Sequence, residues 1–217
     1  KALKTKRLAS VIATKVPPAQ LKPKDLRVSC ENSLKNLQTD YIDLYQIHWP
    51  RTGDAKFDSG INMNDSVGEL NKLYEEGKIR SIGVSNFGVK DFNEVTKLTH
   101  VVSNQLPYNG VWRSIEFEIQ DLCITKNSGI IVYTPLAQGI LTGRYNNPDE
   151  VPDGISRSRL FSKDRSPLCV HNESGCEEIL FTTINKIRTL SDRYDVSMAV
   201  LSLGWLKTRE GILSILV

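Results

Sequence analysis

The sequence lacks the features that mark a membrane protein or a nucleic-acid-binding protein. It has no apolar run close to the roughly 18 residues that a membrane-spanning helix needs. It also has no run of five or more lysines and arginines. The net charge of +3 is compatible with an anionic small ligand but is too small to indicate nucleic acid. We therefore expect neither a membrane nor a nucleic acid as a partner.

The chain also lacks a signal peptide and a recognisable metal motif. Its first four residues, KALK, contain no apolar core of the kind that signal peptides carry. Cys169 and Cys176 flank His171, but their spacing fits no common zinc pattern, so no metal is expected. Cys30 and Cys123 fall within helical patterns and are expected to be buried thiols. A reduced, cytoplasmic setting follows as the default expectation.

Apolar runs of strand length alternate with helical periodicities along the chain, which predicts parallel βαβ units. Strands are expected at residues 8–14, 41–48, 79–85, 101–105, 130–134 and 212–217. Helices are expected at 24–37, 65–76 (capped by Asp65 and ended by Gly77), 90–98, 116–126, 177–194 and 197–207 (capped by Ser197). The glycine-rich turn that normally follows the first strand of a doubly wound sheet is missing. We therefore expect an α/β fold of the (β/α)8 TIM-barrel type, in a single domain over 1–217 with a long loop at about 136–176.

Polar residues end five of the strand-like runs. In a parallel barrel the C-terminal ends of the strands carry the active site, so these side chains are expected to face one pocket. The candidates are Lys15, His48, Ser85 with Asn86, Gln105, and Tyr133 with Thr134.

Four longer segments, taken in order, resemble the aldo-keto reductase family. They are DYIDLYQIHWP (residues 40–50), EGKIRSIGVSNF (76–87), NQLPYN (104–109) and YTPLAQGILTGRY (133–145). The resemblance implies a (β/α)8 barrel that binds NADPH without a Rossmann domain. It also implies hydride transfer to an aldehyde or ketone, or the reverse reaction.

The resemblance assigns roles to individual residues. His48 and Lys15 resemble the catalytic histidine and lysine of the family. Ser85, Asn86 and Gln105 resemble the residues that hydrogen-bond the nicotinamide carboxamide, and Tyr133 resembles the aromatic residue that stacks on the nicotinamide ring. The loop around the pyrophosphate would contain Thr134, Leu136, Gln138, Gly139, Leu141 and Gly143.

These residue types suit the chemistry. A carbonyl that accepts hydride develops negative charge on its oxygen, which needs hydrogen-bond donors and a proton. A lysine lowers the pKa of a neighbouring acid through its positive charge. A carboxamide has one acceptor and two donor hydrogens, which Ser, Asn and Gln side chains can satisfy.

Structural interpretations compete with these roles. Lys15 alone would be a solvated lysine, Ser85 and Asn86 alone would be a helix N-cap pair, and Tyr133 alone would be a core aromatic residue. Trp49 and Trp112 follow strand ends and either line a substrate pocket or pack in the core or rim. His100 and His171 are expected at the surface. For Arg157, Arg159 and Arg165 we expect solvation, with contact to the cofactor phosphates as the alternative.

The family's proton donor is a tyrosine paired with an aspartate on earlier strands, and neither can be assigned here. The segments correspond to about strands three to eight of the barrel, so we expect either a longer protein or a truncation that needs a partner to close its sheet. An NADPH-dependent carbonyl reductase is the preferred hypothesis, with NADPH favoured over NADH by family analogy alone. The alternatives are a catalytically impaired nicotinamide-binding regulatory module, like the potassium-channel β subunits of this family, and a non-functional fragment. Neither the carbonyl substrate nor the oligomeric state follows from the sequence.

Overall fold

A computed structural model describes residues 6–50 and 62–217. The expectations for the basic first residues and for most of the loop after Pro50 fall outside these ranges. The strands are β1 (Ala13–Val16), β2 (Leu44–Ile47), β3 (Ile82–Ser85), β4 (Ser103–Pro107), β5 (Gly129–Tyr133) and β6 (Ile212–Ile215). The helices are α1 (Pro23–Leu37), α2 (Met63–Glu75), α3 (Val89–Val95), α4 (Ile119–Thr125), α5 (Asp153–Ser156), α6 (Glu177–Tyr194) and α7 (Met198–Lys207).

The six strands form one sheet whose order, β1 to β6, is the order of the chain. The pairs β1–β2, β2–β3 and β3–β4 are parallel, and their register places Lys15 opposite Gln46 and Ser85 opposite Gln105. A doubly wound sheet reverses its strand order at a switch point, and this sheet does not. The predicted α/β class and barrel-type strand order are therefore confirmed.

The chain clusters into two compact units. Unit 1 consists of Lys1–Leu106 and Ile115–Ile131, and unit 2 consists of Pro107–Ser114 and Val132–Val217. A single domain over 1–217 stays a prediction, and the two units are described separately below.

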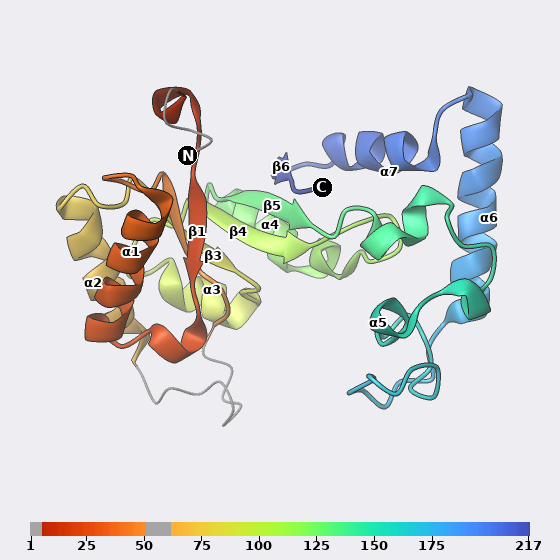
Figure 1. The fold of residues 1–217 in the computed structure, drawn as a ribbon, viewed down its shortest axis with the longest axis horizontal. Coiled ribbons are helices and arrows are strands. Elements are labelled where there is room, and N and C mark those ends of the chain that lie inside the picture. The colour runs from red at the N-terminus through yellow and green to blue at the C-terminus, as the bar shows by residue number, and fades with distance from the viewer. Residues whose placement is uncertain (1–5, 51–61) are drawn as a thin grey trace. The chain divides into compact units, whose positions relative to one another are not determined.

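In unit 1, helices α1 and α2 lie side by side (Figure 1). Their apolar faces bury residues such as Leu26 of α1 and Leu70 of α2 completely. Arg27 of α1 bridges to Glu69 of α2 (Nε to Oε1, 2.5 Å) and to Glu76 just after α2 (Nη2 to Oε1, 2.7 Å). The helix pair is thus held by an apolar seam with ion pairs beside it.

Gly83 in β3 is closely packed by its neighbours in the sheet. A β-carbon built there would lie 2.8 Å from Ser103 Oγ, 2.9 Å from Leu44 Cδ1 and 3.0 Å from Gln46 Cγ. Side chains of the two neighbouring strands therefore fill the space above this glycine.

Unit 2 contains the predicted long loop at 136–176, which is folded. Short 3-10 helices at Ala137–Thr142 and Pro148–Glu150 are followed by α5. Backbone hydrogen bonds join residues 160–163 to residues 173–176, with Cys176 N–H donating to Leu160 O at 2.9 Å. Leu141 and Phe161 of this loop are fully buried in one apolar cluster with Ile184 of α6. The loop at 136–176, which we call the excursion, therefore packs against α6 as part of the unit 2 core.

Local side-chain contacts explain two wrong boundaries. The strand predicted at 8–14 is a 3-10 helix at Arg7–Ala9 followed by the short β1. Arg7 donates to Ser10 O (2.9 Å), to Tyr41 O (2.8 Å) and to Thr39 Oγ1 (2.7 Å), and these bonds replace regular pairing there. The prediction that Asp65 caps the helix at 65–76 is also wrong. Asn62 caps this helix, α2, by accepting from Asn64 N–H at 3.0 Å.

Of the other helix predictions, one is wrong and three are confirmed. The helix predicted at 116–126 is broken at Glu118 (φ −149°) into a 3-10 helix at Ser114–Phe117 and α4. Gly77 follows α2 with a left-handed φ of 72°, which confirms its role in ending that helix. The bounds of α6 and the Ser197 cap of α7 are confirmed, since Ser197 Oγ accepts from Val200 N–H at 3.2 Å. Within the described residues no helix is both long and apolar enough to cross a bilayer.

Candidate active site

His48 and Lys15 lie at the ends of neighbouring strands in unit 1. The His48 N–H donates to Val16 O at 3.0 Å, which extends the β1–β2 pairing by one residue and fixes the start of the histidine side chain. The imidazole is largely exposed, and Lys15 is half-buried. Sheet register therefore brings together the two residues that the family resemblance names as catalytic.

The two side chains influence each other's charge. Partial burial lowers the pKa of His48, and the positive charge of Lys15 lowers this pKa further. Partial burial also lowers the pKa of Lys15. An imidazole with a lowered pKa is neutral at pH 7 and carries one N–H donor and one acceptor nitrogen. His48 is thus prepared to hydrogen-bond a polar ligand without carrying charge.

A hydrogen-bonded group connects His48 to the ends of β3 and β4. Asn86 Nδ2 donates to His48 O (3.0 Å) and to Ser85 Oγ (3.1 Å), while the Asn86 backbone N–H donates to Gln105 O (2.9 Å). Ser85 Oγ donates in turn to Gln105 O at 3.0 Å. Asn86 has a left-handed φ of 62°, which an asparagine tolerates better than most residues. The structure therefore brings together His48, Ser85, Asn86 and Gln105, which we call the strand-end cluster.

The alternative interpretation of Ser85 and Asn86 as a helix N-cap pair is wrong. Gly88 is the N-cap residue of α3, and no side chain accepts a capping hydrogen bond there. The Ser85 hydroxyl and the Asn86 side-chain amide instead make the hydrogen bonds between strand ends described above.

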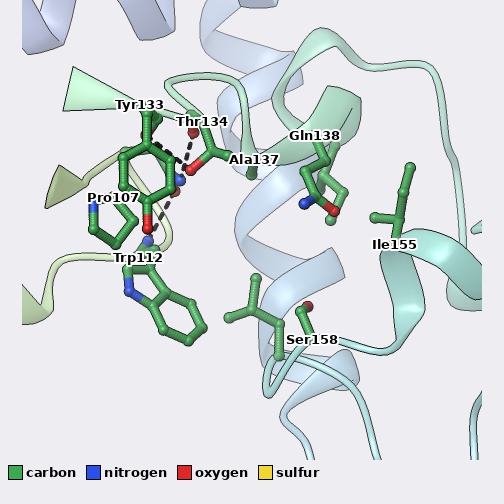
Figure 2. A pocket seen from close by; sticks show the side chains of 11 residues that line it. Pro107, Trp112, Tyr133, Thr134, Ala137, Gln138, Ile155 and Ser158 are labelled. Carbon is green, nitrogen blue, oxygen red and sulfur yellow. Dashed lines mark hydrogen bonds between the residues drawn. The ribbon is translucent and has the colours of Figure 1, made fainter. Parts of the chain in front are cut away.

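Tyr133 and Thr134 lie in unit 2, where β5 ends beside a cavity of about 220 Å³ (Figure 2). Figure 2 shows Tyr133 and Trp112 on one wall, with Gln138 and Ile155 across from them. Tyr133 is half-buried, and burial raises the pKa of its phenol. From the sequence, Trp112 was expected either to line a substrate pocket or to pack in the core or rim. In the structure it lines the cavity.

The segment after Thr134 has an unusual backbone. Thr134, Ala137 and Gln138 all have left-handed φ values, of 51°, 49° and 55°, and Gly139 follows at 98°. Gly143 is also left-handed (φ 79°). Hydrogen bonds within the loop stabilise this backbone: Ala137 N–H donates to Thr134 O at 3.0 Å and Gly139 N–H to Leu136 O at 2.9 Å. Leu136 is half-buried, and the Leu141 side chain is fully buried in the core, so any ligand contact of Leu141 would be through its backbone.

Several residues that line this cavity were missed by sequence reasoning. Pro107, Asn109, Ile155, Ser158 and Leu160 line it, and none was predicted as a site residue. The segment NQLPYN, quoted for the resemblance, contains both Pro107 and Asn109, so a signal was present without a role attached to it. Ile155, Ser158 and Leu160 come from the long loop at 136–176, which has no periodic signal.

Two of the three arginines of the long loop, Arg159 and Arg165, have acidic partners. Arg165 pairs with Asp149 and lies 3.8 Å from Glu177, and Arg159 lies 3.6 Å from Glu173. These ion pairs favour the solvated interpretation over phosphate contacts. No cluster of three or more potential metal ligands occurs in residues 6–50 and 62–217.

Comparisons with known proteins identify the family. The whole chain, residues 1–217, matches the Aldo/keto reductase family, and the protein therefore belongs to that family. It is similar to the aldo-keto reductase YhdN of Bacillus subtilis (strain 168), with 38% identity over 83% of this chain and 50% of the relative. It is also similar to the NADH-specific methylglyoxal reductase of Escherichia coli (strain K12), with 31% identity over 90% of this chain and 56% of the relative. The chain spans about half the length of these curated relatives.

A solved structure supports the same assignment. An aldo/keto reductase from Klebsiella pneumoniae, solved in complex with NADP and acetate, matches with a TM-score of 0.71 and 29% identity. The match covers 99% of this chain and 62% of that protein. The predicted family and fold are thus confirmed.

Proposed function

We propose that this chain forms part of an NADPH-dependent reductase that converts aldehydes or ketones to alcohols by hydride transfer. The observation that carries the proposal is the strand-end cluster, which joins the ends of three neighbouring strands beside Lys15. Relatives named as reductases, and a neighbour solved with NADP, support it.

The residues present fit a nicotinamide cofactor. Ser85, Asn86 and Gln105 bring hydroxyl and amide groups to adjacent strand ends, as a carboxamide with both donors and an acceptor requires. Tyr133 offers an aromatic face beside the cavity of unit 2, and the left-handed segment from Thr134 to Gly139 follows it directly, where the family resemblance puts the pyrophosphate loop. We assign these residues to cofactor binding, together with Leu136, Leu141 and Gly143.

His48 and Lys15 are assigned to the chemistry. When bound, the nicotinamide cofactor supplies the hydride. Neutral His48 donates a hydrogen bond to the carbonyl oxygen, stabilises the negative charge that develops there and orients the carbonyl group. Burial is the larger cause of the lowered His48 pKa, and Lys15 contributes positive charge next to the site that lowers it further.

The proposed partner is a small carbonyl compound, and the proposed setting is the cytoplasm. All four cysteines are free thiols, which supports a reducing compartment.

The test combines cofactor binding with turnover in the full-length protein. NADPH and NADH would be titrated by fluorescence, and reduction of benzaldehyde and of methylglyoxal would be followed by loss of NADPH absorbance. We expect saturable NADPH binding and turnover of at least one aldehyde. Tight NADPH binding without turnover on a broad carbonyl panel would support the regulatory-module alternative instead. A flat titration with both cofactors would overturn cofactor binding altogether.

A further inference from the structure

Asn109 closes the turn that follows β4 in unit 2. Its Oδ1 accepts from the N–H groups of Val111 (3.0 Å) and Trp112 (2.9 Å). The backbones of Asn109 and Trp112 also exchange two hydrogen bonds of 3.2 Å each. The backbone position of Trp112, and with it the start of the indole side chain, is therefore fixed by Asn109.

The other end of the same side chain reaches the loop after β5. Asn109 Nδ2 donates to Thr134 O at 2.9 Å, and Thr134 is the first left-handed residue of the loop. The preceding carbonyl, Tyr133 O, accepts from Tyr108 N–H (3.3 Å) and from Thr134 Oγ1 (2.8 Å). Two successive carbonyls are thus tied to residues 108 and 109 where the chain leaves the strand.

One carboxamide therefore connects the two segments that form one wall of the cavity. Trp112 and Tyr133 lie on this wall in Figure 2. Asn109 is only 3% exposed, so water cannot readily replace a hydrogen bond that it loses. We infer that Asn109 is a positioning residue: it holds the turn of Trp112 and the left-handed start of the cofactor loop in one arrangement. This inference rests on the proposed function, because it assigns the loop to cofactor binding.

Only a side chain with an acceptor and a donor can make both connections. In Asn109→Asp the carboxylate keeps the acceptor for the two turn amides, but it loses the donor to Thr134 O and places negative charge near that carbonyl. In Asn109→Ala both connections are lost. The two variants thus separate the turn from the loop, which a role limited to general stability would not do.

The experiment compares wild-type full-length protein with both variants. NADPH affinity is measured by titration, and the environment of Trp112 is measured as the acrylamide-sensitive emission that Trp112→Phe removes in each background. Backbone amide exchange is measured for residues 134–139 in the free protein. We expect Asn109→Asp to retain wild-type Trp112 quenching, to exchange faster at 134–139 and to bind NADPH about tenfold more weakly. Asn109→Ala should change all three readouts.

Ser128→Ala provides the matched control. Ser128 is buried, and its hydroxyl donates to Val101 O at 2.5 Å just before β5 begins, at the opposite end of that strand from Tyr133. This variant loses a comparable buried hydrogen bond, so it should lose stability while exchange at 134–139 and NADPH affinity stay at wild-type values.

The outcomes separate the inference from the proposed function. Unchanged exchange at 134–139 in Asn109→Asp would overturn the positioning role whether or not NADPH binds. Wild-type NADPH affinity in both folded Asn109 variants would also overturn it. Failure of the wild-type protein to bind NADPH would overturn the proposed function, and the exchange measurement would still decide whether Asn109 holds the loop.

Discussion

The two units position their candidate site residues by different means. In unit 1 the strand-end cluster is held by sheet register and by hydrogen bonds between neighbouring strands, such as Asn86 N–H to Gln105 O at 2.9 Å. In unit 2 the cavity is shaped by a loop whose residues Thr134, Ala137 and Gln138 are left-handed, and by one asparagine side chain. Position follows from regular structure in unit 1 and from individual contacts in unit 2.

This difference affects how each part should respond to mutation. A strand end is supported by many backbone hydrogen bonds, so replacing a side chain such as His48 should remove its chemistry and leave its neighbours in place. The loop of unit 2 is held by individual contacts instead of a strand ladder, so replacing Asn109, which contacts two segments, should move other residues as well. The predictions below probe this contrast, from the largest expected effect to the smallest.

Replacing His48 should have the largest effect. Under the proposed function, His48→Ala removes the neutral donor from the carbonyl oxygen, and kcat should fall roughly 10²- to 10⁴-fold. NADPH affinity should change little, because the Asn86 contact uses the backbone carbonyl of His48, which remains in the variant. Steady-state kinetics and NADPH titration together provide the measurement.

His100→Ala is the control for this variant. His100 is exposed and outside the strand-end cluster, so its replacement should leave kcat unchanged. Turnover close to wild type in His48→Ala would exclude the role assigned to His48, and a simultaneous loss of NADPH binding would show that the strand end is less robust than the comparison states.

Thiol labelling should distinguish the packed interior of unit 1 from the loop of unit 2. Burial raises the pKa of Cys30 and of Cys123 to about 11, so little of either thiol is in the reactive thiolate form at pH 8. Cys169 is partly exposed in the loop and should react first. Cys176 should follow, because burial and the nearby Glu177 raise its pKa.

Peptide mass mapping after timed alkylation at pH 8 gives the order of labelling. Labelling after denaturation provides the control, because all four thiols should then react at similar rates. If Cys30 reacted as fast as Cys169 in the folded protein, unit 1 would be opening readily and the contrast between the units would fail.

Packing in unit 1 is tested by Gly83→Ala. The added methyl group would meet Ser103 Oγ at 2.8 Å and Leu44 Cδ1 at 2.9 Å, so these buried side chains must move, at a cost of about 1–3 kcal/mol in the free energy of unfolding. Gly68→Ala is the matched control, because a β-carbon there meets nothing within 4 Å and Gly68 lies inside α2. Alanine should stabilise that helix by about 0.5–1 kcal/mol. Urea denaturation measures both, and equal effects of the two variants would contradict the close packing at Gly83.

The contrast between the units also explains what the sequence could predict. Polar residues that directly follow apolar runs, such as Lys15, His48 and Gln105, are placed by the strand that precedes them. Their approximate positions therefore followed from the pattern alone. The strand boundaries were less accurate because side chains such as Arg7 compete for backbone groups near the first strand.

The residues of the unit 2 cavity could not be found in the same way. Asn109 contacts its own turn through one end of its carboxamide and Thr134, 25 residues further along the chain, through the other, and no periodicity encodes such a pair of contacts. Ile155 and Ser158 reach the cavity because the excursion packs on α6 through Phe161 and Ile184. That arrangement depends on tertiary packing, so the sequence indicated only a long polar loop.

The smallest effect is expected when Lys15 is replaced, because the replacement alters only the charge that acts on the His48 pKa. Burial lowers the pKa of His48 first, and the positive charge of Lys15 lowers it further. Lys15→Met removes the second cause only, so the His48 pKa should rise while staying below its usual value of about 6.5. The acidic limb of the kcat/KM profile should then move to higher pH, because protonated His48 appears sooner as the pH falls.

Proton NMR titration can follow His48 directly, since the chain has only three histidines. Lys126→Met is the matched control, because Lys126 is an exposed lysine of unit 1 that does not act on His48. In that variant the His48 titration should be unchanged. A lower His48 pKa in Lys15→Met, or an equal shift in both variants, would contradict the coupling between Lys15 and His48. The strand-end cluster would then owe its neutral imidazole to burial alone.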